Sequence, residues 1–189
     1  MKTYKETLIS KCKKHAIVHG IFAVIIMIVI FIFSSQKGYE SSSLSGSVFE
    51  FISKILSPVM PESFMSFLET YIRKLAHVSI YFLLGIFTSL CSIWIYKYRI
   101  YKGLITVCTK LRAFFHYFTG WAVALLYAVS DEIHQAMVPG RSCEIADMGL
   151  DSLSAIVGTL LVALFSIRSI RKAGKFIAEE ERPYNPKAI

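Results

Sequence analysis

The sequence predicts an all-α integral membrane protein, a four-helix bundle with short interfacial helices in its first external loop. Hydrophobic residues make up 54% of its 189 residues, above the roughly 45–50% apolar content of soluble domains, and the mean hydropathy is +0.54. Four apolar segments are long enough to span a bilayer. The net charge of +8 comes from basic clusters between these segments. This pattern favours membrane lipids, and no nucleic acid, as partners.

The first two spans are nearly uninterrupted. A hydrocarbon core about 30 Å thick requires ~20 mostly apolar helical residues. Ala16–Phe33 is rich in Ile, Val, Phe and Ala, and Leu75–Tyr96 is apolar apart from a histidine near its start. A cleaved signal peptide is the alternative for the first segment. Its apolar run, however, is longer than an h-region of ~7–15 residues, and no A-x-A-like cleavage site follows.

The third and fourth spans must include acidic residues to be long enough. Phe114–Ser130 is too short alone, so we expect its helix to continue through Asp131 until Pro139 ends it. Leu150–Phe165 is extended in the same way by residues 145–149, at its start. Both extensions bring carboxylates into the membrane region.

Basic residues predict the orientation, because cytoplasmic loops are enriched in Lys and Arg. Bases are concentrated before the first span, between the second and third, and after the fourth, so these segments belong inside. In the segment 37–74 acidic residues offset the basic ones, and the connection between the third and fourth spans has Arg141 as its only basic residue. Both segments therefore belong outside. The predicted organisation is a cytoplasmic N-terminus (1–15), a transmembrane domain (16–167) and a cytoplasmic tail (168–189).

The first external loop contains two amphipathic segments. Apolar residues recur at helical spacing over Val48–Leu56 and again over Phe64–Ile72, and Pro58 and Pro61 separate the two segments. We therefore expect two short helices, the second of which runs into the second span. They lie on the outer leaflet or merely cap the bundle, and the sequence does not decide between these roles.

Polar side chains gather near the outer ends of the predicted spans. An ionisable side chain at the centre of a span costs at least ~2.5–3.5 kcal/mol, so it is expected to face a partner or water. Helical spacing aligns many of these residues in stripes. The candidate site residues are Arg73, Lys74, His77, Tyr81, Asp131, Glu132, Gln135, Arg141, Asp147 and Asp151. We infer a site that binds or transforms a polar group; a salt-bridge cluster that only positions the helices is the alternative.

Two of these carboxylates need a positive partner. Asp131 and Glu132 lie toward the C-terminal end of their helix, where the macrodipole disfavours negative charge. Candidates for compensation are Arg73, Lys74 and Arg141, and the Pro-Gly pair before Arg141 predicts a turn that folds it back over the site. Individually, Glu132, Lys74 and His134 are expected to be solvated at the membrane boundary.

Three sequence strings carry a family resemblance: FSSQ at 33–36, KLAHVSIYFLLG at 74–85 and SDEIHQAMVPGR at 130–141, followed by Asp147. With them the chain resembles the VanZ-like family of bacterial membrane proteins, whose namesake is associated with teicoplanin resistance. The family pattern continues D-x-x-x-[ND]-x-x-G-x-x-x-G, in which Ser154 occupies the place of the first glycine. The resemblance implies a multi-pass protein of the bacterial cell membrane.

The resemblance is compatible with three functions. The first is binding or remodelling of lipid-linked peptidoglycan precursors, which would reduce the access of lipoglycopeptides to them; Arg73 and Arg141 suit phosphate or carboxylate groups. The second is an enzyme acting on a lipid phosphate or acyl group, with His77 as acid or base and Asp131 orienting it. The third is a transport component that assembles as a homodimer.

A cofactor does not follow from the sequence. In the enzyme hypothesis Asp147 or Asp151 would hold a cation, but both are weak candidates because no strong ligand spacing such as HExxH is present. No Ser or Cys stands in a recognised nucleophile motif. The catalytic candidates are therefore His77 and Asp131 alone.

Overall fold

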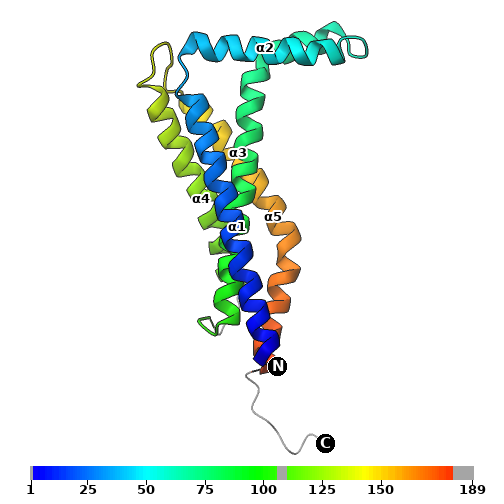
Figure 1. The fold of residues 1–189 in the computed structure, drawn as a ribbon, viewed down its shortest axis with the longest axis vertical. Coiled ribbons are helices and arrows are strands. Elements are labelled where there is room, and N and C mark those ends of the chain that lie inside the picture. Colours follow the sequence, from blue (N-terminus) through cyan, green and yellow to red (C-terminus); the bar gives the residue numbers. More distant parts are fainter. Residues whose placement is uncertain (1, 106–109, 181–189) are drawn as a thin grey trace, which may run out of the picture.

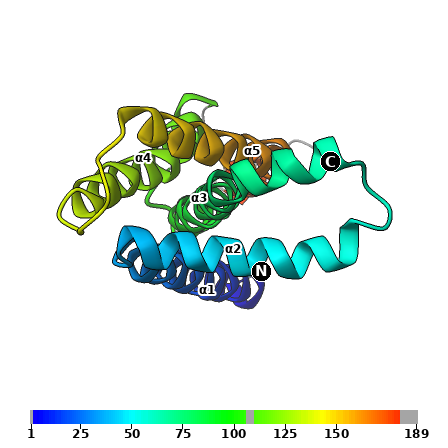
Figure 2. The same cartoon turned by 90° about the horizontal axis from the view of Figure 1, so that it is seen from above.

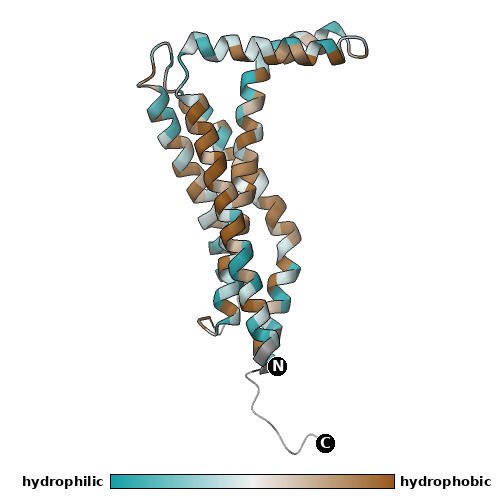
Figure 3. Cartoon of the chain, in the orientation of Figure 1, coloured by the Kyte–Doolittle hydropathy of each residue, from teal (hydrophilic) through white to brown (hydrophobic). Residues whose placement is uncertain are grey.

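Four long helices form the body of the computed structural model, which describes residues 2–105 and 110–180 (Figure 1). They are α1 (Lys2–Ser34), α3 (Glu62–Tyr101), α4 (Lys110–Gln135) and α5 (Ile145–Glu180), and α2 (Gly38–Leu56) lies across one end. Each long helix contains a segment long and apolar enough to cross a membrane. Hydrophobic residues form a band between more hydrophilic ends (Figure 3). The predicted all-α multi-pass membrane fold is confirmed.

The long helices extend beyond the predicted spans. Helix α1 begins at Lys2, and α5 continues to Glu180. Cys12 of α1 and Ile177 of α5 are both buried in an apolar core together with Ile93 of α3. We call this end of the bundle, where α1 begins and α5 finishes, the terminal end. Residues on both sides of the predicted membrane domain therefore complete the core there.

Helix α3 is the centre of the bundle and packs against each of the other four helices (Figure 2). Two glycines allow the closest approaches. A Cβ atom at Gly85 of α3 would overlap the backbone of Ala155 in α5, and one at Gly158 of α5 would overlap the Phe82 carbonyl in α3. The α3 and α5 backbones therefore touch without intervening side chains, as in small-residue packing of membrane helices.

Helix α2 and the first turns of α3 form a hairpin that projects sideways from the bundle (Figures 1 and 2). Pro58 and Pro61 lie in the connection between the two helices, so the predicted pair of helices is confirmed. The first residue of α2 is anchored by a hydrogen bond from the Gly38 N–H to the Pro139 carbonyl, at 3.2 Å. Beyond the bundle, the hairpin exposes the apolar side chains of Phe51, Ile55, Val59 and Phe67.

We call the end of the bundle that α2 crosses the polar end. It contains the C-terminal ends of α1 and α4, the N-terminal end of α5, and the connection between α4 and α5 (Figure 1). All the candidate site residues predicted from the sequence lie at this end or in the helical turns next to it. The fold therefore brings together polar residues of α3, α4 and α5 and of the connection between α4 and α5.

Candidate functional site

A polar cavity of about 400 Å³ lies at the polar end, between α3, α5 and the connection that joins α4 to α5. Most of the predicted site residues line it. They are Arg73, Lys74, His77, Gln135, Arg141, Asp147 and Asp151, accompanied by Ser142 and Glu144, which the sequence did not single out. The cavity thus has cationic and anionic walls within one enclosure.

Two arginines, Arg73 and Arg141, line this polar cavity. Neither Arg73 nor Arg141 forms an ion pair with any residue that the structure describes. Burial lowers the pKa of the Arg141 guanidinium, and the neighbouring positive charge of Arg73 lowers it further. The carboxylates of Asp131 and Glu132 act on the Arg141 pKa in the opposite direction. Guanidinium groups that line one cavity have the chemistry to bind phosphate or carboxylate groups.

A turn places Arg141 in the cavity wall. Gly140 adopts a positive φ of 79°, in the left-handed region that glycine tolerates best. The Arg141 guanidinium then donates to the Gln135 side-chain oxygen at 3.0 Å and to the Phe33 carbonyl at 3.2 Å. That carbonyl belongs to the last turn of α1, where a cation is favoured by the macrodipole. The predicted return of Arg141 over the cluster is confirmed.

Gln135 links this arginine to two buried carboxylates. Its side-chain amide donates to Asp131 at 3.0 Å and to Glu132 at 3.2 Å. Glu132 also accepts the backbone N–H of Glu144 at 3.0 Å, and it is only 2% exposed. The prediction that Glu132 is solvated was wrong, because the connection after α4 folds back and covers it. The positive charge of Arg141, which was predicted to compensate the carboxylates at this helix end, thus reaches them through the Gln135 side chain.

His77 faces Asp151, a carboxylate that is 1% exposed. The His77 Nδ1 and Asp151 Oδ2 atoms are 3.5 Å apart, and neither oxygen of Asp151 accepts a hydrogen bond from the described part of the chain. The buried Tyr81 hydroxyl likewise has no partner there. Buried polar atoms are usually paired. Of these two residues, Asp151 lines the polar cavity, so its oxygens are available to a further polar group there.

Lys74 and Asp147 occupy the rim. Their charged atoms are 3.4 Å apart, and their side chains are 53% and 32% exposed. An exposed pair of this kind contributes little to stability. Lys74 is thus solvated as predicted. Within residues 2–105 and 110–180, no group of three or more His, Cys, Asp or Glu side chains is placed to hold a metal ion.

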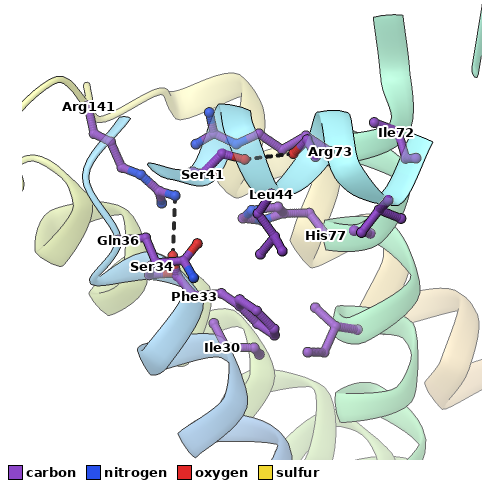
Figure 4. Close-up of a pocket in the computed structure, with 14 residues that line it drawn as sticks. Ile30, Phe33, Ser34, Gln36, Ser41, Leu44, Ile72, Arg73, His77 and Arg141 are labelled. Atoms are coloured by element: carbon purple, nitrogen blue, oxygen red, sulfur yellow. Dashed lines mark hydrogen bonds between the residues drawn. The ribbon is translucent and has the colours of Figure 1, made fainter. Parts of the chain in front are cut away.

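An apolar cavity of about 220 Å³ adjoins the polar one, between α1, α2 and α3 (Figure 4). Arg73, His77 and Arg141 line both cavities and therefore form their common boundary. The remaining walls are largely hydrophobic and include Ile30, Phe33, Leu44, Val48, Ile72 and Ile80. Sequence reasoning missed this cavity, because its existence depends on how α2 lies over the bundle.

The comparison with protein families identifies a relationship over most of the chain. The sequence pattern of the VanZ/LLP1 family matches residues 20–166. This stretch begins inside α1, ends inside α5 and includes every residue that lines the two cavities. Neither a curated protein nor a solved structure matches the chain.

Proposed function

Because this chain belongs to the VanZ/LLP1 family, we propose that it binds anionic, lipid-linked groups of the bacterial cell envelope. In this proposal the polar cavity is the binding site. Occupancy of the site lowers susceptibility to lipoglycopeptides of the teicoplanin class, because it changes the access of these antibiotics to lipid-linked peptidoglycan precursors. The polar end faces outward, since the basic clusters of the sequence lie toward the other face.

The unpaired arginines are the observation that supports this proposal. Arg73 has no hydrogen bond or ion pair with a described residue, and Arg141 uses its donors on a neutral amide and a carbonyl. Both face the polar cavity. A phosphate or pyrophosphate group would supply the missing negative charge and accept planar, bidentate hydrogen bonds. Bonds to charged groups of this kind contribute about 1.5–3 kcal/mol each.

The test is a double variant, Arg73→Gln with Arg141→Gln, expressed in bacteria that otherwise lack the protein. We expect the variant to reach normal abundance in the membrane and to lose its effect on teicoplanin susceptibility. Lys172→Gln is the matched control, because Lys172 is an exposed residue of α5 at the terminal end. A double variant that retains the full effect at normal abundance would rule out the anion site.

One observation favours a second candidate function. The His77–Asp151 pair lines the polar cavity, and a histidine oriented by a buried carboxylate is a common general acid or base. An enzyme acting on a lipid phosphate or acyl group would use His77 for proton transfer, with Asp151 in the orienting role that the sequence suggested for Asp131. Turnover of a lipid phosphate by the wild type, lost in His77→Gln with binding retained, would favour this alternative.

A further inference from the structure

The apolar cavity has the size and lining of a site for hydrocarbon. It is lined by Ile30 of α1, by Leu44 and Val48 of α2, and by Ile72 and Ile80 of α3 (Figure 4). Its volume of about 220 Å³ exceeds the roughly 150 Å³ of an engineered apolar cavity that stays dry and binds benzene. Water gains little from entering such a space, whereas a flexible hydrocarbon chain gains the burial of its methylene groups.

Helix α2 covers this cavity with a single face. Ser41, Leu44, Ser45 and Val48 follow the spacing i, i+3, i+4, i+7, which places them on one side of the helix, and all four line the cavity. The Ser45 hydroxyl is already used, because it donates to the Ser41 carbonyl at 2.9 Å. This face therefore offers mainly carbon atoms to a ligand.

The boundary between the two cavities is cationic. Arg73, His77 and Arg141 line both, so positive groups stand where the apolar cavity meets the polar one. Figure 4 shows Arg73 and Arg141 on the α2 side of the cavity and Ile30 deeper along α1. From the polar cavity toward the apolar one, a ligand would meet first a polar space, then the two arginines, and then hydrophobic walls. A phosphate-bearing lipid has its groups in the same order.

We propose that the ligand is a phosphate-bearing lipid whose headgroup occupies the polar cavity and whose hydrocarbon chain enters the apolar cavity beneath α2. This inference rests on the proposed function, because it takes the arginines to bind the headgroup. It adds that the protein also recognises the hydrocarbon chain of the lipid. A soluble phosphate ester would occupy only the first of the two cavities and bind more weakly than the lipid.

The experiment uses the full chain in phosphatidylcholine nanodiscs that contain a trace of phosphatidic acid with a diazirine in the middle of one acyl chain. After photolysis, we expect cross-links to map to Ile30, Leu44 and Val48. Cross-links confined to lipid-facing residues such as Leu126 and Leu164, which are 69% and 74% exposed, would overturn the inference.

A pair of matched variants tests occupancy of the cavity. Val48→Trp narrows the apolar cavity, whereas Val123→Trp makes the same change on α4; the two valines are 42% and 41% exposed. Excluding two methylene groups should reduce cross-linking at Ile30 and Leu44 roughly tenfold in Val48→Trp, with no change in Val123→Trp. Equal cross-linking in both variants would show that the acyl chain of the lipid does not occupy the apolar cavity.

A second probe separates this inference from the proposed function. A phosphatidylcholine probe with the same diazirine has the chain without a free phosphate monoester. Enrichment of the phosphatidic acid probe, lost in the Arg73→Gln, Arg141→Gln variant, supports headgroup binding. If the phosphatidic acid probe is enriched but its labels lie outside the apolar cavity, the proposed site for the hydrocarbon chain is wrong, whereas the proposed anion site is supported. If the two probes label equally, the proposed anion site itself fails.

Discussion

The two ends of the bundle bury ionisable groups in different ways. At the terminal end, Lys97 is 8% exposed; its ammonium donates to the Ser169 hydroxyl at 2.8 Å and lies 3.8 Å from the centre of the Trp94 ring. At the polar end, Asp151 is 1% exposed, yet its oxygens accept no hydrogen bond from the described residues. The His77 Nδ1 atom lies 3.5 Å from its Oδ2 atom.

This difference separates a structural charge from a candidate binding group. A buried polar atom without a partner costs about 1–3 kcal/mol, so folds normally satisfy it. Lys97 is satisfied within the chain by a hydroxyl and an aromatic face. Asp151 lines the polar cavity. Neither its oxygens nor the buried Tyr81 hydroxyl has a hydrogen-bond partner in the described part of the chain. The terminal end thus satisfies its buried charge within the fold, whereas the polar end leaves buried polar atoms without a hydrogen-bond partner among the described residues.

The largest effect is all-or-none and concerns which end faces outward. In a variant that retains only Cys143, a thiol reagent that cannot cross the membrane should label intact cells, because Cys143 is exposed at the polar end. A variant that retains only Cys12 should not react, since Cys12 is buried at the terminal end. Labelling of Cys143 only after permeabilisation would mean that the polar end faces the cytoplasm. Cys108, also predicted to be inside, lies outside the described residues.

The next effect is complete loss of function without loss of protein. His77→Gln removes the ring that faces Asp151 but introduces no charge, so abundance in the membrane should stay normal while the effect on teicoplanin susceptibility disappears. Both quantities must be measured on the same cells. If the polar end were only a salt-bridge cluster, stranding a buried charge would cost about 3–5 kcal/mol and abundance would fall together with the effect.

A stability measurement tests the terminal end. Ser169→Ala leaves the buried Lys97 ammonium without its acceptor and should destabilise the purified protein by about 1.5–3 kcal/mol. Lys97→Met removes the charge as well as the need for the acceptor, so we expect a change of about 1 kcal/mol or less. Thermal unfolding in detergent compares the two variants. The reverse order of stabilities would mean that the lysine is not a satisfied structural charge.

The smallest effect concerns the beginning of α2, which covers the polar end. The Glu40 carboxylate accepts the Lys37 backbone N–H at 3.1 Å in an exposed position. Glu40→Gln should weaken this helix start by about 0.3–1 kcal/mol, because the negative charge at the N-terminus is lost. Hydrogen exchange should quicken in the first turn of α2 and remain unchanged in α5. Faster exchange throughout the bundle would contradict this local role.

The sequence predicted the membrane spans, the hairpin and the Pro-Gly turn, because each depends on local composition or periodicity. It did not predict which side chains pair across helices. The stripe that contains His77 could be read from its spacing, but the rotation of α5 that brings Asp151 against the ring is set by tertiary packing. Similarly, the burial of Glu132 depends on a backbone N–H from the connection after α4, which has no helical period.

The contact between Gly38 and Gly140 joins the two connections at the polar end. A Cβ atom on Gly38 would overlap the Gly140 carbonyl, so the start of α2 sits directly on the turn that carries Arg141. A movement of α2 away from the bundle, which would widen the apolar cavity, would break this backbone contact and remove its support from the turn that carries Arg141. Opening the path for a hydrocarbon chain and loosening the cationic wall would then be a single event. The residence time of a bound lipid would be set by how often these two backbones separate.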